Sequence, residues 1–74
     1  MTTAYILVNT DTGQEYSVYD EIKALKGVVE VNIVYGVYDI VVKVKTEDND
    51  ELRRLIEFVR KISGIRSTLT LIAI

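Results

Sequence analysis

The stretch that decides the fold is VEVNIVYGVYDIVVKV, residues 29–44, in which two alternating apolar runs flank a glycine. Apolar side chains recur at every second position on both sides, and this is the period of half-buried β-strands. Gly36-Val37 between the runs suits a two-residue type II′ turn, because the first position of that turn needs a positive φ that glycine adopts freely. The stretch therefore predicts a β-hairpin with Gly36 at its tip.

This turn also predicts the register of the hairpin. The expected pairs are Tyr35 with Tyr38, Ile33 with Ile40, Val31 with Val42, and Val29 with Val44. All eight side chains then share one face, since alternate residues of a strand point the same way. The opposite face carries Glu30, Asn32, Val34, Asp39, Val41, Lys43 and Lys45. Asp39 is expected on that mixed face, at the tip of the hairpin.

Composition limits the class of protein. The chain has 74 residues, no Cys, no His and a formal charge of -2. One small domain is predicted, with a core near the lower limit for independent stability, so that self-association is the available source of extra burial. The residue types exclude disulfides and thiolate metal sites, and no cofactor is indicated. The charge argues against direct nucleic-acid binding. No apolar run is long enough for a membrane span and no basic signal opens the chain, so a cytoplasmic protein is expected.

The rest of the chain alternates between strand and helix signals. Residues 4–8 form a continuous apolar run, which is typical of a central strand. Thr12 and Glu15 have the spacing of a capping box, so a helix is expected to begin near Gly13 and to end at Gly27. Its apolar stripe is Val18, Ile22 and Leu25. Asp48 with Glu51 predicts a second helix start, followed by a stripe of Leu52, Leu55, Ile56, Val59 and Ile62 that ends at Gly64. The last strand is predicted over residues 66–74.

The two halves of the chain repeat at an offset of 37, which superposes Gly27 on Gly64 and Val18 on Leu55. The order βαββαβ with matched halves predicts an α+β, ferredoxin-like fold, a four-stranded antiparallel sheet with both helices on one face. The uncovered face is expected to carry Tyr5, Leu7, Val34 and Val41 with alternate residues of the last strand. Such an apolar surface favours a second copy packed sheet to sheet.

Asp39 is the sharpest candidate for a functional residue. The residues alone favour an Asp that caps the hairpin by bonding to its own backbone. The alternative is a carboxylate that receives the ammonium group of a small ligand at a subunit junction. Hydroxyls at Ser67, Thr68 and Thr70 either bind a ligand or are ordinary strand residues. The residues in question leave these alternatives open.

Other chemistry finds little support in the sequence. Tyr5, Tyr35 and Tyr38 could stack on bases, as in RNA-recognition modules of the same topology, but the signature and charge of those modules are missing. Acidic pairs lie where helix termini and solvated faces favour them, so no enzyme is indicated. A copper chaperone of this topology would need Cys-x-x-Cys.

Gly36-x-Tyr38-Asp39 between its two apolar strands, with Ile62-x-Gly64-Ile65 leading into Ser67-Thr68-Leu69-Thr70, resembles the effector domain of the Lrp/AsnC family of transcriptional regulators, the RAM domain. The resemblance covers residues 1–74 as a single domain without the DNA-binding helix-turn-helix, as in stand-alone RAM proteins. It implies an amino-acid sensor whose dimers pack sheet to sheet and assemble into octamers or similar rings.

The resemblance also implies site residues and partners. The ligand would be a free amino acid held between subunits by the backbone of Gly36, Val37 and Tyr38, the carboxylate of Asp39, and Ser67, Thr68 and Thr70. The module would act on full-length Lrp/AsnC regulators or on enzymes of amino-acid metabolism. A purely structural oligomerisation module and a detached ACT-type regulatory domain are the alternatives. An ACT domain would favour a glycine-rich turn after the first strand, where this chain has Asn9-Thr10-Asp11-Thr12-Gly13.

Overall fold

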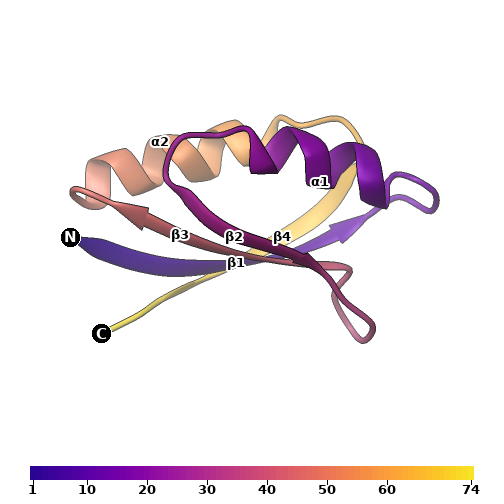
Figure 1. Cartoon of the computed structure of the whole chain (residues 1–74), viewed down its shortest axis with the longest axis horizontal. Helices are drawn as coiled ribbons and strands as arrows, with labels where there is room; N and C mark the ends of the chain where they lie inside the picture. Colours follow the sequence, from indigo (N-terminus) through magenta and orange to yellow (C-terminus); the bar gives the residue numbers. More distant parts are fainter.

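The computed structural model describes all 74 residues and has the predicted element order βαββαβ (Figure 1). Its elements are β1 (Thr2–Thr10), α1 (Glu15–Lys23), β2 (Val28–Ile33), β3 (Ile40–Thr46), α2 (Asn49–Arg60) and β4 (Ile65–Ile72). The four strands form one antiparallel sheet in the order β2-β3-β1-β4, so β1 is central as predicted. Both helices lie on the same side of this sheet (Figure 1). The ferredoxin-like α+β fold is therefore confirmed.

The core lies between the helices and the two central strands. Alternate residues of β1 and β3 are fully buried, as their period-2 pattern requires. The helices cover them with the apolar stripes expected from the sequence. The buried apolar residues are Ala4, Ile6, Val8, Val18, Ile22, Ile40, Val42, Val44, Leu52, Val59 and Ile62. Each large side chain buried in this way contributes about 1.5–3 kcal/mol, and this burial is the main source of the fold's stability.

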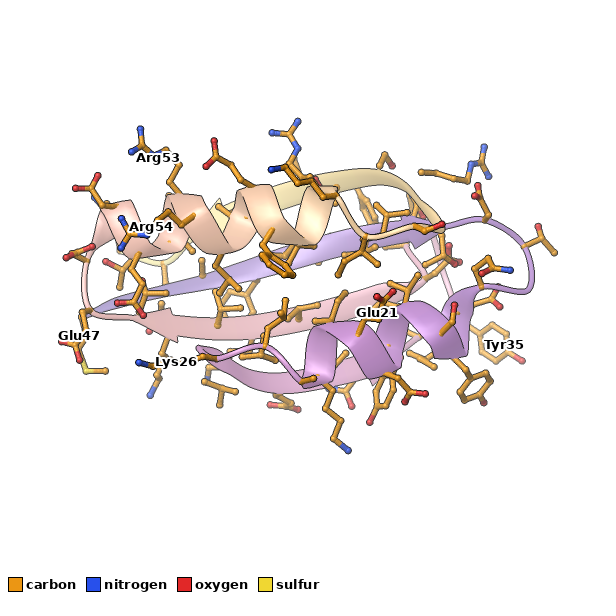
Figure 2. All side chains as sticks on the ribbon, turned by 90° about the horizontal axis from the view of Figure 1, so that it is seen from above. Glu21, Lys26, Tyr35, Glu47, Arg53 and Arg54 are labelled. Carbon is orange, nitrogen blue, oxygen red and sulfur yellow. The ribbon has the colours of Figure 1, made fainter.

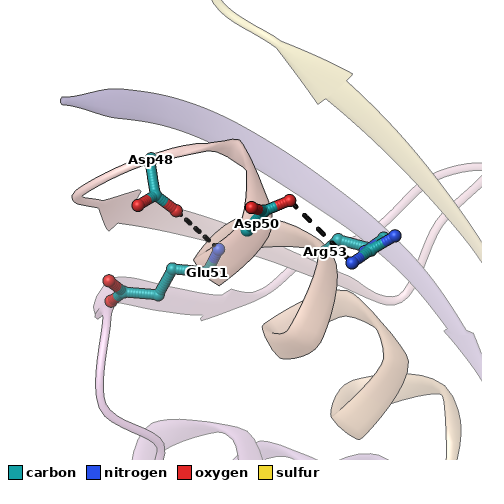
Figure 3. Close-up of polar contacts among 4 residues, drawn as sticks. All are labelled: Asp48, Asp50, Glu51 and Arg53. Atoms are coloured by element: carbon teal, nitrogen blue, oxygen red, sulfur yellow. Dashed lines mark hydrogen bonds and ion pairs between the residues drawn. The ribbon is translucent and has the colours of Figure 1, made fainter.

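The two helices start differently. Asp48 caps α2 as predicted, since its Oδ1 accepts the backbone N–H of Glu51 at 2.8 Å (Figure 3). The capping box expected at Thr12 is wrong, because α1 starts at Glu15 with Gln14 at its N-cap and no side chain caps it. A turn closed by the bond from Gln14 N–H to the Asp11 carbonyl, 3.0 Å, precedes the helix. This turn places Thr12 ahead of the N-cap position.

The internal repeat is visible in the turns after the helices. Gly27 and Gly64 have φ values of 96° and 97°, so both occupy the left-handed region. The predicted helix ends at these glycines are wrong, because α1 already ends at Lys23 and α2 at Arg60. Both glycines also approach other atoms closely. A Cβ on Gly64 would lie 3.1 Å from the Cβ of Gln14, and one on Gly27 would lie 3.3 Å from a Leu55 methyl. These glycines allow the chain to turn tightly from each helix into the next strand.

The hairpin differs from its predicted form. Ile33 opposite Ile40 and Val31 opposite Val42 are confirmed. The pairing of Val29 with Val44 is wrong, because a bulge between residues 28 and 30 puts Val28 opposite Val44 and leaves Val29 54% exposed. The two-residue turn is also wrong, since the strands stop at Ile33 and resume at Ile40.

Residues 34–39 instead form an open loop that bends away from the helix layer (Figure 1). Tyr35 in this loop is fully exposed and is not paired with Tyr38. The reason is that Asp39 bonds to β1. Its N–H donates to the Val8 carbonyl at 2.9 Å, and one bond from Val34 N–H to the Asp39 carbonyl, 2.8 Å, closes the base of the loop.

The uncovered face of the sheet is apolar at its centre, as predicted. Val41, Leu7 and Leu69 follow one another across β3, β1 and β4, and Lys43, Tyr5 and Leu71 form the next row. We call these six residues the open face. Leu69 and Leu71 are 45% and 49% exposed. Val34 was expected here but belongs to the loop. None of the helices is both long and apolar enough to cross a membrane.

Candidate functional site

Asp39 is the last residue of the hairpin loop, and its side chain accepts hydrogen bonds from the end of β1. Its Oδ2 accepts the backbone N–H of Thr10 at 2.8 Å and the Thr10 hydroxyl at 3.4 Å. The carboxylate therefore provides the acceptor that a backbone carbonyl would supply in the next rung of the β1–β3 ladder. Thr10 is 4% exposed, so its N–H needs this partner. The prediction that Asp39 bonds to its own hairpin is corrected, because its partner is the end of β1.

The second oxygen of this carboxylate is unengaged. Both hydrogen bonds of the Asp39 side chain go to Oδ2, and Oδ1 has no protein partner. A carboxylate has about four acceptor positions, so the anchored group can still accept hydrogen bonds from a ligand. The contact to Thr10 fixes the orientation of the carboxylate, and a fixed acceptor loses little freedom on binding.

A pocket of about 450 Å³ lies beside this loop. The lining residues come from the start of α1 and from the end of β2 with its loop; they are Glu15, Tyr16, Ile33, Val34, Tyr35 and Asp39. Figure 2 shows Tyr35 at the same end of the molecule as the start of α1. The volume is in the range of small-ligand sites. Two carboxylates and two tyrosines in an otherwise apolar lining suit a small ligand that carries a positive charge.

Of the six lining residues only Asp39 was predicted as a site residue, and Glu15 and Tyr16 are the two that lie outside the hairpin. Glu15 was explained as part of a capping box, and Tyr16 falls outside the apolar stripe of α1. No local signal connects them with the hairpin, because the β2–β3 loop and the start of α1 come together only when the sheet forms. Gly36, Val37 and Tyr38 belong to the predicted loop, yet they do not line the pocket.

The predicted hydroxyls lie elsewhere. Ser67 is opposite Asn9, Thr68 is opposite Val8 and Thr70 is opposite Ile6, all across the β1–β4 pair. Since β1 separates β3 from β4, these hydroxyls and Asp39 are on different sides of the central strand. Ser67 and Thr68 line a separate pocket of about 290 Å³ with Arg60, Ile65 and Arg66. Thr70 lines neither pocket. In a single chain the predicted site residues therefore do not line one common pocket.

The fold and the pocket define a class, a small α+β module with a candidate ligand site at one end of its sheet. Comparison with known families makes the class specific. Residues 3–74 match the family described as the Lrp/AsnC ligand binding domain. The chain belongs to this family, and the predicted resemblance is confirmed. The family is a ligand-binding domain, so the chain is a regulatory ligand-binding module.

Solved structures agree with this assignment. The protein FFRP-DM1 is 43% identical, with a TM-score of 0.96 over all of both chains. PHS023 from Pyrococcus horikoshii is also 43% identical, with a TM-score of 0.94 over all of this chain and 90% of that one. AsnC of E. coli is 28% identical with a TM-score of 0.89, and the match covers 97% of this chain but 50% of AsnC. Separate small proteins and a part of a longer chain thus share this fold.

Curated relatives include an enzyme. Homocitrate synthases of Saccharolobus islandicus and Saccharolobus solfataricus are 46% identical over 54 residues, which make up 73% of this chain. The chain spans about 12% of the length of these curated relatives. The likeness therefore concerns one segment of a much longer protein.

Proposed function

We propose that this protein is an amino-acid sensor in which the free oxygen of Asp39 receives the α-ammonium group of the ligand. The proposal rests on the carboxylate of Asp39. Its Oδ2 accepts hydrogen bonds from Thr10, and its Oδ1 has no hydrogen-bond partner in the protein. Glu15 lines the same pocket and adds a second negative charge. The membership in a ligand-binding family supports a ligand at this position. Backbone groups of Gly36, Val37 and Tyr38 do not line this pocket in the single chain, so they would bind the α-carboxylate only where a neighbouring subunit brings the loop against the ligand.

Self-association completes the proposed site. The open face carries Tyr5, Leu69 and Leu71 at 37–49% exposure, and a second copy packed against it would remove this surface from water. The loop of residues 34–39 bends toward that side of the sheet, where a neighbouring subunit could cover it (Figure 1). Octamers or similar rings stay a prediction. Ser67, Thr68 and Thr70 join the amino-acid site only if a neighbouring subunit supplies them.

The proposed downstream partner is an enzyme of amino-acid metabolism or a full-length regulator of the Lrp/AsnC family. The 46% identity to a segment of homocitrate synthase supports a module that acts on an enzyme. The likeness to E. coli AsnC supports a module that acts with a transcriptional regulator. An ACT-type domain finds no support in the family match. A purely structural oligomerisation module is the second candidate, favoured by the bond that commits Asp39 to Thr10.

Calorimetric titration of the twenty amino acids, with the mass in solution recorded before and after each addition, tests the proposal. We expect saturable binding of at least one amino acid at a fixed ratio per subunit. Asp39→Asn keeps an oxygen for Thr10 but removes the negative charge, so it should abolish binding and preserve the fold. Absence of heat from all twenty amino acids, with a stable oligomer, would favour the structural module.

A further inference from the structure

We propose a second ligand site in this protein, one that binds a small oxyanion such as phosphate or a dicarboxylate between the end of α2 and the start of β4. The site is the pocket of about 290 Å³ lined by Arg60, Ile65, Arg66, Ser67 and Thr68. Four of these five side chains are polar, and two carry a permanent positive charge. The proposal goes beyond the amino-acid site, because its charged groups, Arg60 and Arg66, have no part in that site.

The two arginines have no competing partner within the protein. The one ion pair in the structure joins Arg53 to Asp50 at 3.8 Å, so Arg60 and Arg66 are free. The surrounding chain is also basic, because residues 58–74 contain two arginines and one lysine but no acid, although the whole protein carries a charge of -2. Two acids lie close by in the fold: Glu57 stands three residues before Arg60 in α2, and the Asp11 N–H donates to the Gly64 carbonyl at 2.8 Å. Neither of them lines the pocket.

One hydroxyl of the pocket, that of Thr68, lies on the same side of the sheet as α2, because Thr68 is opposite the buried Val8. Ser67 points to the other face, where its Oγ accepts from Asn9 Nδ2 at 3.3 Å. Thr68 is half-buried and its hydroxyl has no hydrogen bond within the protein. Guanidinium groups have no acceptor atoms at all. A set that offers donors and positive charge selects an oxyanion and rejects an ammonium group.

The fold holds the two arginines at the same corner. Arg60 lies in the last turn of α2, and Arg66 is the second residue of β4. Gly64 between them packs tightly against Gln14 and Val18 of the α1 region, which fixes the path of the turn. Arg60 also suits the negative end of the helix dipole. That explanation requires neither Arg66 nor the Thr68 hydroxyl, whereas an oxyanion site uses both of them together with Arg60.

Titration of the full chain with sodium phosphate and, separately, with succinate tests the site, with chloride at constant ionic strength as background. We expect saturable binding of one or both anions at one per subunit. Arg60→Gln and Arg66→Gln should each weaken it about tenfold, since each removes a charge-assisted hydrogen-bonding group. Arg53→Gln is the matched control, because it removes the same charge from α2 at an arginine outside the pocket. Binding should be unchanged in that control.

Two results would overturn the proposal. One is heat that never saturates with either anion, and the other is an equal loss in Arg53→Gln, which would indicate general attraction to a basic surface. Arg60 and Arg66 are exposed, so both variants should keep the wild-type circular dichroism spectrum. Asp39→Asn separates the two sites. This variant should bind no amino acid but should bind phosphate with the wild-type affinity. If the wild-type protein itself binds no amino acid, the phosphate titration still tests the oxyanion site.

Discussion

In the proposed function, Asp39 serves two purposes with one carboxylate. Oδ2 completes the hydrogen bonding of the buried end of β1, and Oδ1 is left for a ligand. The proposed ligand contact at Oδ1 leaves the bond from Thr10 to Oδ2 in place, so substitution can distinguish the two roles. The first prediction therefore separates the structural contribution of Asp39 from its charge.

Asp39→Ala should lower the free energy of unfolding by about 1–3 kcal/mol, because the buried N–H of Thr10 loses its acceptor. Asp39→Asn should cost less than about 1 kcal/mol, since its amide oxygen can take over the bond to Thr10. Urea denaturation followed by circular dichroism measures both. Equal stability of wild type and Asp39→Ala would contradict the structural role and would leave Asp39 as a binding residue alone.

Within a single element, individual residues decide where a helix starts and where it ends. Asp48 and Thr12 both precede a glutamate at the capping distance, yet only Asp48 makes the bond. Asp48→Ala should therefore destabilise the protein by about 1 kcal/mol, the usual cost of a lost N-cap. Thr12→Ala is the control and should change the urea midpoint little. A large effect of Thr12→Ala would show that the capping box forms in solution.

The turn from α2 to β4 depends on close packing as well as on backbone conformation. Gly64→Ala should cost clearly more than about 1 kcal/mol, because it adds a contact near 3.1 Å to the strain of a positive φ. Gly13→Ala has a similar φ of 85° but meets nothing within 4 Å, so it measures the strain alone. Thermal denaturation of both variants gives the difference. Equal losses would show that the turn can shift to admit a methyl group.

At the scale of the whole molecule the open face is the dominant feature. A chain of 74 residues buries a limited core, and here one side of the sheet has no helices over it. Lys43 lies beside Tyr5, but the central row of Val41, Leu7 and Leu69 is wholly apolar. The same surface of a second copy would bury it, because a two-fold symmetric dimer places identical patches against each other.

Val41→Asp should dissociate or unfold the protein, because it places an unpaired charge in the centre of the proposed interface. Val29→Asp is a matched control, since Val29 is 54% exposed on β2 and outside the open face. Size-exclusion chromatography with light scattering measures the mass of both. A folded Val41→Asp protein with the mass of wild type would refute the assignment of this face.

The sequence by itself determined the element order, the central place of β1, the buried stripes and the family. The first three follow from periodicity and from glycine positions, which are properties of neighbouring residues. The family follows from the resemblance carried by residues 36–39 and 62–70. The open loop, the bulge at Val29 and the partner of Asp39 were decided by tertiary structure, since they depend on where β1 ends beside β3. The same reason separates Ser67 and Thr68 from Asp39 and places them beside Arg60, because strand order across a sheet is not written in any single segment of the chain.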